Sequence, residues 1–243
     1  MNGPLLTFAA QNPNAFVRHL LSTDVRVPRV GNGRTSQHRE RYVMARFLAT
    51  AYTQGLIEFP IAIDHRDNTG NPDFSLSFGG AEIGAECVEV VAQEWYAIEA
   101  IRRRDFPDTM TFYHRFEPRS HVYSKTEKAN IASGSALGSG WAGDDPEREW
   151  ANAHAYFIED KIQKLRKGNY QPLERVWLVM QDEWRVPVTT EDEKLLALSY
   201  LLPKLPRLLN SPSFERVFIC SDSMLFEIAA ADHNVYPLEN WWQ

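Results

Sequence analysis

The chain has 243 residues, of which 44% are hydrophobic, 24% are charged and 12% are aromatic. This mixture is typical of a globular protein and excludes a largely disordered chain. The formal net charge of −6 disfavours a protein that coats nucleic acid through a uniformly basic surface.

The length and the cysteine content predict one domain in a reducing compartment. A chain of this length suits a single domain over residues 1–243. Cys87 and Cys220 lie in apolar segments without a CxxC pair, so we expect buried free thiols and a cytoplasmic protein. The first residues lack the basic and apolar parts of a signal peptide, and no apolar run has membrane-spanning length.

The first third of the chain is predicted to contain two helices and a strand. Residues 14–21 have the apolar spacing of a short helix. Ser36 is expected to cap a second helix that extends to about Thr53 and buries Met44, Phe47, Leu48 and Ala51. Residues 56–63 favour a strand, and Pro60 within them is typical of an edge or interrupted strand.

Residues 71–91 have the pattern of a β-hairpin. Residues 74–78 alternate between apolar and polar side chains, which is the period of a half-buried strand. Gly79 and Gly80 can adopt the positive φ angles of a tight turn. The apolar run over residues 83–91 then predicts a central strand.

Two carboxylates in this hairpin are candidates for chemistry. Asp73 opens the first strand, and Glu86 lies within the second, where an uncompensated charge is costly. A hairpin of this length brings Asp73 and Glu86 side by side, and converging carboxylates suit a hard cation such as Mg²⁺. The alternative is that Asp73 is a turn residue and that Glu86 pairs with an arginine.

Pro72, Asp73, the hairpin and Glu86 together resemble the core of the PD-(D/E)XK nuclease superfamily, which has the restriction-endonuclease-like fold. The resemblance implies an α/β protein with a mixed central sheet flanked by helices. It also implies that Asp73, Glu86 and the main-chain carbonyl of Cys87 bind Mg²⁺ or Mn²⁺. The family usually has a lysine two residues after the second acid, and Val88 occupies that position here.

Two further residues extend the resemblance. Glu40 in the helix before the hairpin resembles a glutamate that many relatives direct toward the metal. Glu58 is the rival candidate, and a favourable charge at a helix terminus is the structural alternative. In the helix expected over residues 147–167, Lys161 is the candidate for replacing the missing lysine, ahead of Gln163 and Lys164; the alternative is a solvated basic face.

The rest of the chain is predicted to alternate between helices and strands. Helices are expected over residues 92–104, 147–167, 190–209 and 222–230, and strands over residues 111–116, 175–180, 214–220 and 235–238. The helix over 190–209 is expected to bend at Pro203 and Pro206. Regular patterning fades after residue 116, and residues 131–143 are rich in small residues, so a long mobile loop is expected over about 117–146.

Several lysines are candidates for phosphate contacts, with ordinary surface positions as the alternative. The candidate nucleic-acid-binding residues are Lys125, Lys128, Lys164 and Lys167. Other chemistries find no support, because the sequence has no HExxH, no GxSxG and no GxGxxG after a predicted strand.

The resemblance therefore implies a metal-dependent nuclease that hydrolyses phosphodiester bonds, with catalytic residues Asp73, Glu86, Lys161 and Glu40 and with DNA favoured over RNA. Because Val88 replaces the usual lysine, the alternative is a catalytically inactive nuclease-like domain that binds nucleic acid or protein. A third possibility is an α/β protein whose acids are structural. Related nucleases often dimerise, so the resemblance also allows a homodimer, and no membrane partner is expected.

Overall fold

The computed structural model describes residues 5–29, 32–66, 72–109, 115–116, 118, 123–136, 138, 140–167, 174–209 and 214–242. The chain divides into two compact units. The first comprises Met1–Glu89, Asp160–Asp182 and Arg207–Gln243, and the second comprises Val90–Glu159 and Glu183–Pro206. Compact units are not necessarily independent domains, so a single domain over residues 1–243 stays a prediction.

The helices and strands follow one another in the following order along the chain. They are β1 (Phe8–Ala10), α1 (Pro13–Ser22), α2 (Ser36–Thr53), β2 (Ile61–His65), β3 (Phe74–Phe78), β4 (Ala81–Val90), α3 (Gln93–Asp105), α4 (Lys125–Ala132), α5 (Asp145–Arg166), β5 (Arg175–Asp182), α6 (Glu191–Leu201), the 3₁₀ turn η1 (Leu202–Lys204), α7 (Leu205–Leu208), β6 (Arg216–Ser221), β7 (Met224–Ile228) and β8 (His233–Pro237).

The described strands form one sheet in which the spatial order is the same as the chain order, from β1 to β8. Strands β1 to β4 pair antiparallel, β5 and β6 pair parallel, and β6 to β8 pair antiparallel again. The protein is therefore an α/β protein with a mixed central sheet, which confirms the fold class expected from the sequence.

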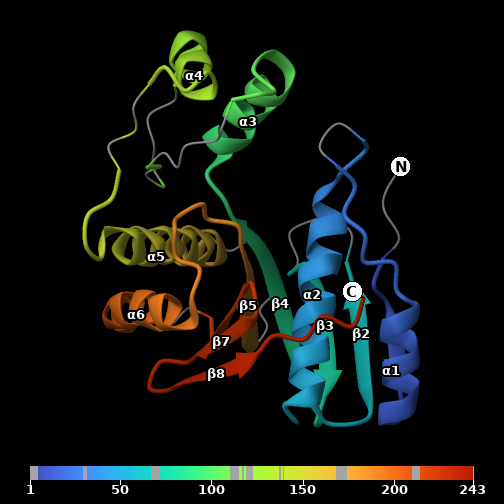
Figure 1. Ribbon diagram of the computed structural model, residues 1–243. Coiled ribbons are helices and arrows are strands. Elements are labelled where there is room, and N and C mark those ends of the chain that lie inside the picture. The colour runs from blue at the N-terminus through green and yellow to red at the C-terminus, as the bar shows by residue number, and fades with distance from the viewer. Residues whose placement is uncertain are drawn as a thin grey trace. The chain divides into compact units, whose positions relative to one another are not determined.

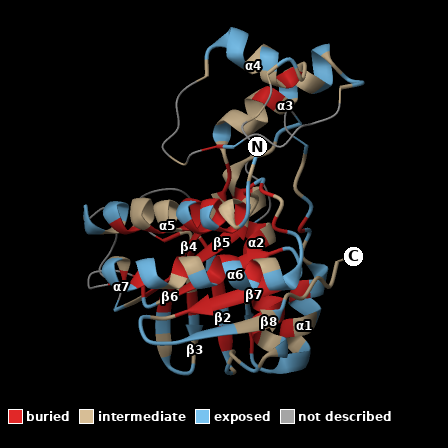
Figure 2. Ribbon diagram, turned by 60° about the vertical axis from the view of Figure 1, so that its left-hand side comes forward, coloured by how far each residue is buried: buried red, intermediate tan, exposed pale blue. Residues whose placement is uncertain are grey.

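Helix α2 contributes most of the helical core of the first unit (Figure 1). Its residues 43–51 are all buried. The ring of Phe47 lies 4.6 Å from that of Phe218 on β6 and 6.1 Å from that of Trp177 on β5. Since burying a side chain of this size contributes about 1.5–3 kcal/mol, these contacts hold α2 against one face of the sheet. Figure 2 shows that the central strands are the most buried part of this unit.

The turn between β3 and β4 forms as the sequence predicted. Gly79 and Gly80 have φ angles of 58° and 75°, and Phe78 pairs with Ala81 across the turn. Positive φ at two consecutive positions is the geometry that glycine adopts at no steric cost. The turn fixes the pairing of β3 with β4 and thereby places Asp73 across the hairpin from Glu86.

The second unit is built around α3, α4, α6 and the first turns of α5. Lys128 on α4 forms an ion pair with Glu94 on α3, with 2.7 Å between the two charged groups. Glu149 on α5 accepts hydrogen bonds from the indole N–H groups of Trp141 and Trp184, at 2.8 and 3.3 Å. Burial raises the pKa of Glu149, and these donors act in the opposite direction. The carboxylate thus links three segments of the unit.

One predicted helix is wrong. Residues 222–230 were expected to be helical, but Met224–Ile228 form β7, which pairs with β6 and β8. Asp222 has a φ of 44°, and it turns the chain back directly after β6. All five residues of β7 are buried, so the apolar run lacks the alternation that distinguishes a strand from a buried helix.

The predicted strand over residues 56–63 is displaced. Strand β2 begins at Ile61, directly after Pro60, and it lies between β1 and β3 rather than at an edge of the sheet. Pro60 has no N–H group to donate to a neighbouring strand, which explains why regular pairing starts after it. Helix α2 does begin at Ser36, but the residue that caps it is Thr35.

Most other predicted elements are confirmed within a few residues. The helices at 14–21, 92–104 and 147–167 correspond to α1, α3 and α5, and the helix at 190–209 is interrupted at Pro203 and Pro206. The strands at 175–180, 214–220 and 235–238 correspond to β5, β6 and β8.

Two predictions fall largely on residues that the structure leaves undescribed. Of the strand expected over 111–116, only residues 115 and 116 are described, and they belong to no helix or strand. Within the loop expected over 117–146, Lys125–Ala132 form α4, which Ser124 caps. The mobility of that segment stays a prediction. No helix among the described ranges has the length and apolar character needed to cross a bilayer.

Candidate functional site

The two acids of the hairpin lie across from each other in the first unit. Phe74 pairs with Ala85, so Asp73, one residue earlier, lies beside Glu86 on the neighbouring strand. The Asp73 carboxylate accepts a hydrogen bond of 2.7 Å from the main-chain N–H of Cys87. The main-chain carbonyl of Asp73 accepts another, of 2.8 Å, from Arg66. Both contacts fix Asp73 at the point where β3 begins.

The surroundings of Asp73 raise the pKa of its carboxyl group from 3.8 to about 7. Loss of hydration is the largest cause, and the negative charges of Glu86 and Glu40 act in the same direction. The Lys161 ammonium and the N–H of Cys87 oppose the shift. The three carboxylates therefore lie within electrostatic reach of one another, and a nearby cation would favour the ionised form of Asp73.

Lys161 reaches this acid pair from α5, 75 residues further along the chain. Its Nζ atom lies 2.7 Å from Oε2 of Glu86. The two side chains are only 16% and 4% exposed, so the contact is largely shielded from water. The partner of Glu86 is thus the lysine proposed to replace the one missing at Val88, rather than the arginine that the structural alternative expected.

The third acid, Glu40, lies in the first half of α2 and accepts a hydrogen bond from His65 on β2. Oε2 of Glu40 and Nε2 of His65 are 3.2 Å apart. The rival candidate Glu58 lies beside Gly79, where a Cβ atom would come within 2.6 Å of its carboxylate. Because Gly79 follows the far end of β3 from Asp73, Glu58 is not part of the acid cluster.

Cys87 contributes its main chain rather than its thiol. The thiol is buried, and burial together with the nearby carboxylates raises its pKa well above the ordinary value. A thiol that keeps its proton is a poor nucleophile and a poor metal ligand. The main-chain carbonyl of Cys87 is therefore the group that agrees with the predicted role. Burial raises the pKa of Cys220 as well, to about 12.

The donor set fits a hard divalent cation held by few protein groups. Among the residues that the structure describes, no set of three or more His, Cys, Asp or Glu side chains is arranged to hold a metal by itself. Mg²⁺ commonly binds through one or two carboxylates and keeps several waters. Asp73 and Glu86, with the Cys87 carbonyl, meet that requirement. The raised pKa of Asp73 reflects first its burial and then the negative charges of Glu86 and Glu40.

Two of the four lysines proposed to contact phosphates form ion pairs with other acids. Lys128 pairs with Glu94, and Lys164 pairs with Asp160 one helical turn away, both at 2.7 Å. Lys125 begins α4 in the second unit, and Lys167 follows the end of α5. The structure therefore brings Asp73, Glu86, Cys87, Lys161 and Glu40 together, and the role proposed for these four lysines stays a prediction.

Sequence reasoning missed two arginines near the acids. Arg34 and Arg39 both bind the carboxylate of Glu89 on β4, at 2.6 and 2.5 Å. Arg34 lies in the loop before α2, 55 residues from Glu89, and Arg39 lies in the first turns of α2, 50 residues from Glu89. These contacts place a second group of charged side chains on β4, the strand that carries Glu86. The basic composition of residues 26–34 was the only signal for it.

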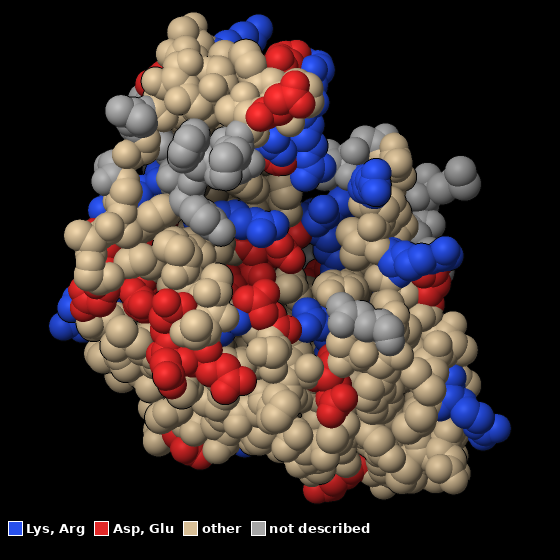
Figure 3. All heavy atoms as spheres, in the orientation of Figure 1, with Lys and Arg blue, Asp and Glu red and all other residues tan. Residues whose placement is uncertain are grey.

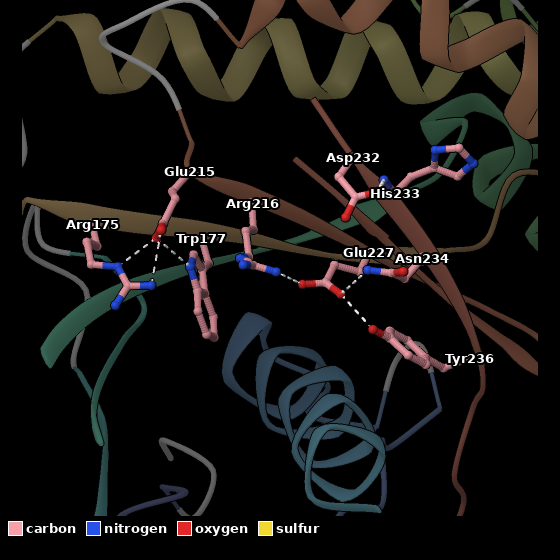
Figure 4. A network of polar contacts seen from close by, with 9 residues as sticks. All are labelled: Arg175, Trp177, Glu215, Arg216, Glu227, Asp232, His233, Asn234 and Tyr236. Carbon is pink, nitrogen blue, oxygen red and sulfur yellow. Dashed lines mark hydrogen bonds and ion pairs between the residues drawn. The ribbon is translucent and has the colours of Figure 1, made fainter. Parts of the chain in front are cut away.

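A separate cavity of about 230 Å³ lies at the other end of α2, in the same unit. Its polar lining includes Arg175 and Arg216, which are engaged by Glu215 and Glu227 (Figure 4). Glu227 also accepts hydrogen bonds from Asn234 and Tyr236. These contacts connect the four strands from β5 to β8. Because each arginine is paired with a glutamate, we interpret them as a structural network rather than a catalytic site.

Charges on the face shown in Figure 3 are mixed, with Lys and Arg side chains next to Asp and Glu side chains. Ion pairs between neighbouring side chains are common in the described residues, as in the contacts of Arg102 and Arg103 with Glu99 at 2.7 and 2.8 Å. A broad basic surface is thus not what this face offers, and any recognition of an anion would be local. No protein-family model, no curated protein and no solved structure matches this chain.

Proposed function

We propose that the chain is a metal-dependent nuclease, related to the PD-(D/E)XK superfamily that its hairpin resembles, and that it hydrolyses phosphodiester bonds, with DNA favoured over RNA. The observation that carries the proposal is the contact of Lys161 with Glu86 beside Asp73. It supplies, from a distant helix, the acid–acid–lysine combination that the hairpin lacks because of Val88. The two buried, unpaired cysteines agree with a cytoplasmic location.

Asp73, Glu86 and the carbonyl of Cys87 would hold Mg²⁺ or Mn²⁺, and Glu40 would reach it through water. When bound, the cation polarises a phosphate oxygen and lowers the pKa of a coordinated water. Asp73 would bind it as a carboxylate and release its carboxyl proton to water. Because the cation would balance the charge of Glu86, the ammonium of Lys161 would become available for the negative charge that develops on the phosphate oxygens.

The alternative is a nuclease-like domain without activity. The contacts of the two acids are also compatible with this alternative. The ion pair of Glu86 with Lys161 and the hydrogen bond from Cys87 to Asp73 satisfy both acids without any cation. A domain of this kind would use its surface to bind nucleic acid or protein. Whether the acids bind metal is therefore the question that separates the two functions.

Cleavage assays with matched variants test the proposal. Single- and double-stranded DNA and RNA are incubated with the protein in Mg²⁺, Mn²⁺ or EDTA. We expect metal-dependent cleavage by the wild type, none by Asp73→Asn, and a loss of about 100-fold or more for Lys161→Met. Lys204→Met, which removes an exposed lysine of the turn η1, serves as the control and should keep full activity. Metal-dependent cleavage by Asp73→Asn would refute the assignment.

A melting experiment distinguishes the inactive domain from the nuclease. Millimolar Mn²⁺ should raise the melting temperature of the wild type by mass action, and Asp73→Asn should not respond. If neither cleavage nor a melting shift is found for the wild type, the inactive binding domain is the better description.

A further inference from the structure

The buried histidine His65 is hydrogen-bonded to Glu40. His65, the last residue of β2, is 2% exposed. Its ring stacks on that of its cross-strand partner Phe74, with 4.2 Å between the ring centres and 20° between the planes. Phe74 follows Asp73 directly in the chain. The ring is therefore held rigidly between the start of β3 and the first half of α2.

The hydrogen bonds of His65 determine which ring nitrogen carries the proton. The main-chain N–H of Leu6 donates to Nδ1 of the ring at 3.4 Å. Since an N–H group can only donate, Nδ1 must accept, and the ring proton resides on Nε2. Nε2 then donates to Oε2 of Glu40 at 3.2 Å. The main-chain N–H of His65 donates to Thr7, which anchors the strand itself.

We propose that His65 is a positioning residue, which holds the Glu40 carboxylate toward the acid cluster and thereby strengthens cation binding there. The inference deepens the proposed function and rests on it. His65 occupies one oxygen of Glu40, Oε2, whereas Oε1 has no hydrogen-bond partner among the described residues. The Glu40 side chain is 15% exposed, so water can reach it. Oε1 is then the atom available for a water bound to the cation.

The contacts of His65 on both sides support this arrangement. The ring is hydrogen-bonded to Glu40 and stacked on Phe74, the residue after Asp73, so it links Glu40 to the start of β3. Groups that orient metal-binding carboxylates through a hydrogen bond typically change metal affinity by 10- to 100-fold when they are removed. A histidine that merely filled the core would affect stability alone.

Binding of Mn²⁺ to the 243-residue chain, measured by calorimetry, tests the proposal in four proteins: the wild type, His65→Leu, Glu40→Gln and the double variant. We expect each single variant to bind Mn²⁺ about tenfold more weakly. Because His65 acts through Glu40, the double variant should bind no more weakly than Glu40→Gln alone. A further tenfold loss in the double variant overturns the proposal.

Two polar variants keep the test decisive if His65→Leu does not fold. Gln places an amide N–H where Nε2 lies and can donate to Glu40, whereas Asn is too short to reach it. We expect His65→Gln to retain most of the affinity and His65→Asn to lose about tenfold. Equal affinities for these two variants overturn the proposal. His19→Leu, which removes a histidine stacked on Phe8 at 5.1 Å, is the control.

The outcomes separate this inference from the proposed function. A wild type that binds no Mn²⁺ overturns both. A wild type that binds Mn²⁺ and is unaffected by His65→Leu overturns the positioning role and leaves the nuclease proposal intact. Melting curves in EDTA confirm for each variant that the affinity is measured on folded protein.

Discussion

At the scale of single residues, the chemistry of the site depends on an electrostatic conflict at Asp73. Two carboxylates and partial burial oppose its ionisation, while Lys161 and one main-chain N–H favour it. These opposing effects leave the pKa of Asp73 at about 7, so that at neutral pH a small change in its surroundings shifts it between the neutral and the ionised form. A cation would resolve the conflict, and without one the ionised form destabilises the fold.

In EDTA, Asp73→Asn is therefore expected to gain stability relative to the wild type as the pH rises from about 4 to 7. The pKa of Asp73 in the folded chain, about 7, exceeds its ordinary value of 3.8. The folded wild type thus keeps a proton that the unfolded chain has lost, and its stability falls over this pH range and is level above it. Asparagine cannot ionise and is still able to accept the hydrogen bond from Cys87.

Urea denaturation at intervals between pH 4 and 8 measures this difference, which should reach on the order of 2–4 kcal/mol above pH 7. Asp64→Asn, at an exposed position of β2, should show no such trend. A difference between Asp73→Asn and the wild type that does not grow with pH would contradict the electrostatic account.

At the scale of elements, strand β4 explains why a lysine can act from two different places. Glu86 and Val88 are two residues apart on β4 and point to the same face of the sheet. Val88 is only partly buried, so a longer side chain can be accommodated there. Lys161 approaches Glu86 from α5 instead. The helix and the strand thus offer alternative positions for one positive charge.

Val88→Lys is expected to restore part of the cleavage that Lys161→Met removes. The new ammonium would lie on the face of β4 that carries Glu86, in the position that the resemblance associates with the motif lysine. The rate of the double variant in Mg²⁺, compared with that of Lys161→Met, measures the recovery. We expect at least a tenfold gain, and Val88→Leu in the same background should give none. A double variant as slow as Lys161→Met would show that the two positions are not equivalent.

At the scale of the whole molecule, recognition of a polyanion has to be local, because the chain carries a net charge of −6. Many basic side chains are paired, as Lys128 on α4 and Lys164 on α5 illustrate. Arg39 lies at the start of α2, contacts Glu89 on β4 and keeps 39% of its side chain exposed. It is the basic residue that we expect to contact a phosphate.

Arg39→Gln should therefore weaken DNA binding and lower its dependence on salt. Loss of one phosphate contact reduces the slope of log K against log salt concentration by about 1. Fluorescence anisotropy in EDTA at several salt concentrations measures the slope without cleavage. Arg18→Gln on α1 is the control. An unchanged slope for Arg39→Gln would exclude this arginine from the interface.

Much of the fold was predictable because it is encoded locally. The alternation over residues 74–78 and the two glycines predicted the central hairpin, and helical spacing predicted α1, α2, α3 and α5. The prediction failed at β7, whose residues are all buried, and at β2, where a proline displaced the start of the strand. Alternation of apolar and polar residues identifies a strand only when one face of the strand is buried and the other is exposed to water.

The candidate site was predictable in its acids and less so in its other members. Asp73 and Glu86 lie a hairpin apart, so their pairing follows from the period of the strands and the two-residue turn. Lys161 was proposed from the resemblance, and its contact with Glu86 spans 75 residues. His65 and the two arginines escaped notice because their partners lie 25 to 55 residues away.

The hairpin, the positions of its two carboxylates and the α/β character of the protein could be inferred from the amino-acid pattern, since they follow from interactions between near neighbours. The folded chain was needed to identify the contacts of Glu86 with Lys161, of Glu40 with His65 and of Glu89 with Arg34 and Arg39. Those contacts join segments far apart in the chain, and they form because packing of the sheet against α2 and α5 brings the segments together.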